Sequence, residues 1–161
     1  MTVIADTSPL QYAVEIDVAD TLFMLYGRIV VPAAVASEMR HPGAPLLLRR
    51  WVEENQQEIE VRSVQVPDDP RLALLDLGER ETIVLAQLTP GSLLIIDDGD
   101  GREEARRRGL RITGLLGVIR DAALRGFLDF DEAIKKLRNT DFRVSPEVEA
   151  LVRRQYGERA R

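Results

Sequence analysis

Short apolar runs alternate along this chain with segments of helical periodicity, and this alternation most limits the fold that the chain can adopt. We expect strands at residues 2–6, 28–32, 58–66, 92–97 and 110–114, and helices at 7–12, 17–26, 33–40, 46–57, 79–88, 102–109 and 115–126. Strands that alternate with helices favour parallel pairing, with helices packed on both faces of the sheet. We therefore predict a three-layer α/β/α fold around a central, mostly parallel sheet of four to five strands.

The length of 161 residues favours one domain spanning residues 1–161. Two more helices, expected at 129–139 and 145–156, would form a C-terminal helical extension covering residues 129–161. The start of the chain has no basic segment followed by a long apolar stretch, and no apolar run approaches the roughly 18 residues of a membrane span. A cytoplasmic protein without a membrane partner is the resulting expectation.

Residue usage excludes several kinds of site. The chain has no cysteine, which rules out disulfides and thiolate metal ligands. Its one histidine, His41, argues against His-rich zinc sites and against a Ser-His-Asp centre. The net charge of −5 argues against a general nucleic-acid coat, but it is compatible with a nuclease whose metal ligands are themselves acids.

Acidic residues follow the expected strands. Asp6 ends the first strand, while Asp97 and Asp98 end a later one; Glu38 and Glu81 lie near the starts of helices that follow loops. Because ligand sites in open parallel sheets form at the carboxyl ends of the strands, these acids could face one crevice. Crowded carboxylates resist ionisation unless a cation or water screens them, and oxygen ligands without His or Cys favour Mg²⁺ or Mn²⁺.

Simpler interpretations of these acids remain open. Asp6 could cap the next helix, and the aspartates around Asp98 could be solvated loop acids or caps. Glu79 and Glu81 lie two positions apart on one helix, so only one of them can enter the crevice, and we favour Glu81. The DDGDG string does not fit a calcium-binding loop, because counting from Asp98 places Arg102 at a ligand position.

Four motifs together carry a resemblance to a known family. The segments VIADTSPL, the helix acid Glu38, LGERETIVLA, and LLIIDDGDGREEARRRGL with ITGLLGVI behind it are similar to PIN domains, in a branch related to VapC-type toxins, over residues 2–128. The resemblance implies an Mg²⁺- or Mn²⁺-dependent ribonuclease, a homodimer, and pairing with a small antitoxin protein. The apolar helix LLGVIRDAAL also favours the homodimer.

Matching the chain to the family's motif position by position gives the candidate site. The resemblance implies that the catalytic acids are Asp6, Glu38, Glu81 and Asp98, and that the metal ligands are Asp6, Glu81, Asp98 and Asp97. Thr7 and Ser8 would lie beside the metal crevice, and Arg102 and Arg106 would position the RNA substrate. The chain departs from the branch at Leu115, where a threonine is often found, and mildly at Thr82, where alanine is usual.

Two other functions compete with a ribonuclease. A response-regulator receiver also has two aspartates after a strand, but the next strand, LRIT, ends here without the required acid. A PIN-like domain that serves only as an interaction partner is the stronger alternative, and Leu115 is its best support. Of these functions we favour the one that the resemblance implies, hydrolysis of RNA phosphodiesters by water that a bound metal ion activates.

Overall fold

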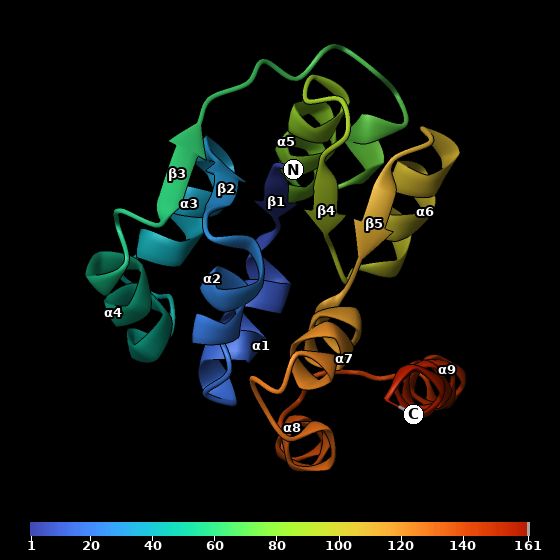
Figure 1. The fold of residues 1–161 in the computed structure, drawn as a ribbon. Coiled ribbons are helices and arrows are strands. Elements are labelled where there is room, and N and C mark those ends of the chain that lie inside the picture. The colour runs from blue at the N-terminus through green and yellow to red at the C-terminus, as the bar shows by residue number, and fades with distance from the viewer. Residues whose placement is uncertain (161) are drawn as a thin grey trace.

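Residues 1–160 are described by a computed structural model (Figure 1). Within them, five parallel strands form one sheet in the order β3-β2-β1-β4-β5. The strands are β1 (Val3–Ala5), β2 (Ile29–Pro32), β3 (Ile59–Arg62), β4 (Leu93–Ile95) and β5 (Arg111–Thr113). The α/β class with a central parallel sheet is confirmed.

The described residues form nine α-helices and one short 3₁₀ helix around this sheet. The α-helices are α1 (Thr7–Glu15), α2 (Asp20–Tyr26), α3 (Ala33–Arg40), α4 (Leu46–Glu54), α5 (Leu77–Gln87), α6 (Gly99–Arg107), α7 (Leu115–Leu124), α8 (Phe130–Arg138) and α9 (Pro146–Arg159). Among residues 1–160, no helix combines the length and the apolar character that a membrane span requires.

Two hydrophobic clusters, one on each face of the sheet, explain why the strands are nearly all apolar. Side chains alternate between the faces along a strand. Val3 and Ala5 therefore pack in one cluster with residues of α1, α4, α7 and α8, while Ile4 packs in the other with residues of α5 and α6. Because both faces are covered, a strand such as β1 is apolar throughout.

Several element boundaries differ from those expected from the sequence; for example, α1 extends to Glu15, α2 begins at Asp20 and α6 begins at Gly99. The strand expected at 58–66 is only Ile59–Arg62, at the edge of the sheet, and its Val61 is exposed. Helix α5 begins at Leu77, two residues before the expected start at 79, because the Asp76 side chain accepts a hydrogen bond from Glu79 N and caps the helix. Glu79 therefore lies in the first turn of α5, as the acid of the capping box.

The C-terminal helices pack onto the rest of the fold through α7. Helix α9 lies against α7, and the rings of Phe130 in α8 and Tyr156 in α9 stack 4.6 Å apart. The segment between α8 and α9 then returns to α1. There Tyr12 Oη donates a 2.8 Å hydrogen bond to Asp141, and the ring of Phe142 meets that of Tyr12 edge to face at 5.0 Å.

Candidate metal centre

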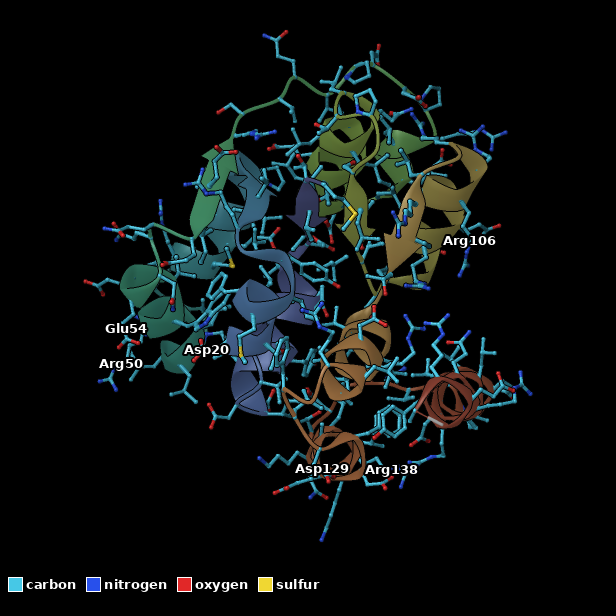
Figure 2. All side chains as sticks on the ribbon, in the orientation of Figure 1. Asp20, Arg50, Glu54, Arg106, Asp129 and Arg138 are labelled. Carbon is cyan, nitrogen blue, oxygen red and sulfur yellow. The ribbon has the colours of Figure 1, made fainter. Side chains whose placement is uncertain are left out.

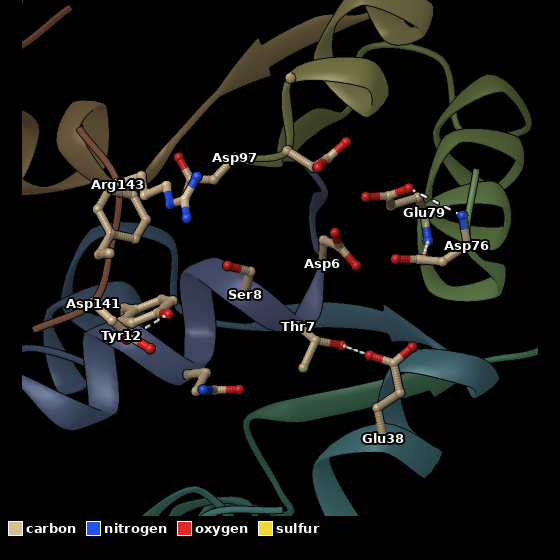
Figure 3. Close-up of a pocket in the computed structure, with 14 residues that line it drawn as sticks. Asp6, Thr7, Ser8, Tyr12, Glu38, Asp76, Glu79, Asp97, Asp141 and Arg143 are labelled. Carbon is tan, nitrogen blue, oxygen red and sulfur yellow. Dashed lines mark hydrogen bonds between the residues drawn. The ribbon is translucent and has the colours of Figure 1, made fainter. Parts of the chain in front are cut away.

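A pocket of about 670 Å³ lies where β1 and β4 end, and acidic residues dominate its lining (Figure 3). The acids come from separate parts of the chain: Asp6 after β1, Glu38 in α3, Asp76 and Glu79 at the start of α5, Asp97 and Asp98 after β4, and Asp141 between α8 and α9. Parallel strands bring these segments together because their carboxyl ends share one edge of the sheet.

Asp6 and Glu79 are the buried acids of this pocket. The Asp6 backbone N–H donates to Ile95 O at 3.0 Å, which fixes Asp6 beside the end of β4, and the residue is only 6% exposed. The pKa of the Asp6 carboxyl is raised from 3.8 to about 7, mainly by burial and in part by the nearby charges of Asp76, Glu38 and Asp98. An ionised carboxylate at this buried position destabilises the fold unless a positive charge lies close to it.

Asp76 and Glu79 hold each other at the start of α5. Asp76 accepts a 2.9 Å hydrogen bond from Glu79 N, and Glu79 accepts a 3.1 Å hydrogen bond from Asp76 N. This reciprocal capping box satisfies two helix-start N–H groups and keeps Glu79 at the pocket. Burial, together with the nearby charge of Asp76, raises the pKa of Glu79 well above its usual range.

Glu38 reaches the pocket from α3. Its carboxylate accepts a 2.6 Å hydrogen bond from Thr7 Oγ1 (Figure 3). Gly78 leaves the room that this arrangement needs: a Cβ at that position would lie 2.8 Å from Glu38 Oε1, 3.4 Å from Asp6 Oδ1 and 3.5 Å from an Asp76 carboxylate oxygen. Carboxylates from three parts of the chain therefore converge where the backbone carries no side chain.

The two aspartates after β4 have different partners. Asp98 is exposed and caps α6 by accepting from Gly101 N at 3.0 Å. Asp97 instead accepts the Leu115 N–H, at 3.1 and 3.2 Å to its two oxygens, at the start of α7. Burial raises the pKa of Asp97 to about 6. Asp97 borders the pocket, but its carboxylate is already held by the backbone of α7.

The structure does not bring Glu81 into the pocket, which corrects the expectation that it lies in the crevice. Glu81 accepts a 3.1 Å hydrogen bond from Ala34 N, in the first turn of α3. A carboxylate is favoured there because the first N–H groups of a helix lack internal partners. Glu79 takes the place in the pocket that we expected for Glu81.

The remaining predicted residues divide between this pocket and its neighbour. Thr7 and Ser8 line the acidic pocket, as expected beside the metal crevice. Arg102 and Arg106 lie outside it and line an adjoining groove. Sequence reasoning missed Asp76, although the spacing of Asp76 and Glu79 is that of a capping box. It also missed Tyr12, Asp141 and Arg143, for which no local signal exists.

The donor set suits a hard divalent cation, because every candidate ligand is an oxygen and the buried carboxylates need positive charge. Within residues 1–160, however, no three His, Cys, Asp or Glu side chains are already spaced around a single ion. Glu38 and Glu79 have long side chains that can rotate toward Asp6. The residues therefore fit the cation in chemistry and placement, and an ion would have to draw the carboxylates together.

The sheet is all-parallel, and carboxylates gather at its carboxyl edge. These two features define an α/β fold that carries an acidic site. The family model described as PIN domain (DUF3368) matches residues 2–158. The chain therefore belongs to the PIN domain family, and the match extends through the C-terminal helices, beyond the residues 2–128 that carried the resemblance.

The fold is similar to that of a solved structure. That structure is a PilT N-terminus domain protein, SSO1118, from the hyperthermophilic archaeon Sulfolobus solfataricus P2, with 15% sequence identity and a TM-score of 0.50. The alignment covers 90% of this chain and all of that chain. At this identity the similarity supports the fold alone. The comparison with curated proteins gives no match.

Proposed function

We propose that this protein is an Mg²⁺- or Mn²⁺-dependent endoribonuclease. The observation that carries the proposal is the buried Asp6 at the end of β1, surrounded by carboxylates from three other parts of the chain. A fold gains nothing from placing repelling acids in a half-closed pocket unless a cation joins them. Membership of the PIN domain family, whose members are typically metal-dependent nucleases, supports the same function.

In this proposal Asp6, Glu38, Glu79 and Asp98 hold the metal ion. A bound divalent ion supplies a water of lowered pKa and stabilises the charge that develops on the phosphate. The chain's own residues position the ligands: the Thr7 hydroxyl orients Glu38, and the capping box with Asp76 orients Glu79. Ser8 offers a hydroxyl at the same pocket. The reaction needs no protein nucleophile, in keeping with the single histidine of the chain.

The test is cleavage of a mixed single-stranded RNA by the purified protein with Mn²⁺, with Mg²⁺ and with EDTA. We expect metal-dependent cleavage, its loss in Asp6→Asn, and its retention in Asp100→Asn, which removes an exposed acid of α6 outside the pocket. Equal cleavage by wild type and Asp6→Asn would contradict the proposed site.

A second candidate is a PIN domain that binds a partner without cleaving RNA. Two observations favour it: the carboxylates are not yet spaced as ligands within residues 1–160, and Leu115 supplies no hydroxyl. Leu115 is buried and reaches the pocket only through its backbone N–H, which Asp97 accepts. Absence of Mn²⁺ binding by calorimetry would support this candidate over the ribonuclease.

The proposed cellular setting rests on the family. We propose a cytoplasmic toxin that is paired with a small antitoxin protein and that acts as a homodimer. The apolar helix LLGVIRDAAL no longer supports the dimer, because it is α7 and Leu115, Leu116, Val118 and Ile119 are buried within this chain.

A further inference from the structure

A second groove, of about 510 Å³, adjoins the acidic pocket. It lies between α6, β5 and α7 on one side and α9 with the segment before it on the other. The two cavities share Asp97, Gly99, Phe142 and Arg143 in their linings, so they lie directly side by side. A chain-like ligand in the acidic pocket can therefore continue directly into this groove.

The groove has the opposite charge to the pocket. Four arginines line it, Arg102, Arg106, Arg120 and Arg143, and the one acid in its lining is Asp97. Arg106 and Arg143 are exposed, and neither forms an ion pair with any carboxylate of residues 1–160. In a chain of net charge −5, a basic groove beside an acidic pocket is a local exception that favours an anionic ligand.

The groove also offers apolar and aromatic surface. Phe142 lies at the junction of the two cavities, where it contacts the ring of Tyr12 edge to face and leaves part of its side chain exposed. On α9, Val148 and Leu151 are 45% and 42% exposed along the groove. Arginines combined with an aromatic face suit a single strand, whose unpaired bases can stack while its phosphates contact the cations.

We propose that the RNA strand runs from the acidic pocket past Arg143 into this groove. Arg106 and Arg143 contact its phosphates, and Phe142 stacks on an unpaired base next to the cleaved bond. This inference rests on the proposed ribonuclease function and adds the path of the strand. A duplex cannot offer an unstacked base to Phe142, so we expect weaker binding of duplex RNA.

The experiment measures binding without metal, so that it does not depend on cleavage. Fluorescence anisotropy with a short labelled single-stranded oligoribonucleotide in EDTA compares wild type with Arg106→Gln/Arg143→Gln across salt concentrations. The matched control is Arg50→Gln/Arg159→Gln, which removes the same charge from exposed sites outside the groove. Figure 2 shows Arg50 and Arg106 on opposite sides of the molecule.

We expect the groove variant to bind about tenfold more weakly than the control, because two phosphate contacts are lost. The slope of log K against log salt should fall by about 0.7 for each lost phosphate contact. Phe142→Leu, which keeps an apolar side chain, should weaken binding of the single strand about fivefold without changing the salt slope. Duplex RNA should bind less tightly than the single strand to wild type.

Equal weakening in the groove variant and the control would overturn the proposal, as would equal binding of duplex and single strand. The proposal would also be overturned if poly-aspartate displaced the labelled strand as effectively as RNA of equal charge does. An acidic protein segment would then be the occupant of the groove. The outcome separates the two proposals. Strand binding through the groove without any metal-dependent cleavage refutes the ribonuclease alone, whereas cleavage that the groove variant retains in full refutes the groove alone.

Discussion

Replacing Asp6 by asparagine should stabilise the protein in the absence of metal, and the effect should depend on pH. Asparagine keeps the size of the side chain and removes the charge. The pKa of Asp6 is about 7 in the fold against 3.8 for a free carboxyl, so the folded state binds the proton more tightly than the unfolded state does. Between these values stability falls as pH rises, because the unfolded state binds fewer protons.

The size of the stability difference follows from the shift in the pKa of Asp6. About three pKa units correspond to about 4 kcal/mol of unfolding free energy once Asp6 is ionised in both states. We expect wild type and Asp6→Asn to be equally stable below about pH 4 and to diverge up to about pH 7, where the variant is more stable by up to about 4 kcal/mol.

Denaturant unfolding in EDTA across this range measures the divergence, with Asp100→Asn as the exposed control. Mn²⁺ at a hundred times its Kd should then reduce the difference to about 1 kcal/mol, because the ion adds about 2.7 kcal/mol to wild type and nothing to a variant that cannot bind it. If Asp6→Asn is no more stable than wild type above pH 7 in EDTA, the buried Asp6 carboxylate does not destabilise the fold as we infer.

Three further predictions test neighbouring features. Glu79→Gln should abolish Mn²⁺-dependent cleavage, whereas Glu81→Gln should retain it. Glu81→Ala should lower the unfolding free energy by about 1–2 kcal/mol, because Ala34 N loses its hydrogen-bond acceptor. Gly78→Ala should leave the fold as stable as wild type or more so, yet weaken Mn²⁺ binding by calorimetry, because its Cβ displaces Glu38. Light scattering at micromolar concentration should give the mass of a homodimer, and a monomeric mass would refute that proposal.

Local patterning was enough to predict the sheet and most of the helices. Apolar runs such as residues 2–6 and 92–97 contain the central strands β1 and β4, because both faces of those strands are covered and no polar position interrupts them. The edge strand β3 is shorter than the run that predicted it. Beyond Arg62 an alternating pattern continues, but no neighbouring strand is there to pair with it.

The candidate site was predicted less fully, and α5 explains why. Two residues along a helix rotate a side chain by about 200°, so Glu79 and Glu81 point in nearly opposite directions, and the local pattern did not show which of them faces the pocket. Other contacts join distant positions and have no local signal. Thr7 meets Glu38 across 31 residues, and Tyr12 meets Asp141 across 129.

The wall of the acidic pocket formed by residues 141–143 comes from a part of the chain distant from the acids that would hold the metal. Those acids all precede residue 99, whereas Phe142 and Arg143 lie between the last two helices. Under the proposed function, substitutions at 141–143 would change the contacts to the RNA without altering the acids that hold the metal ion.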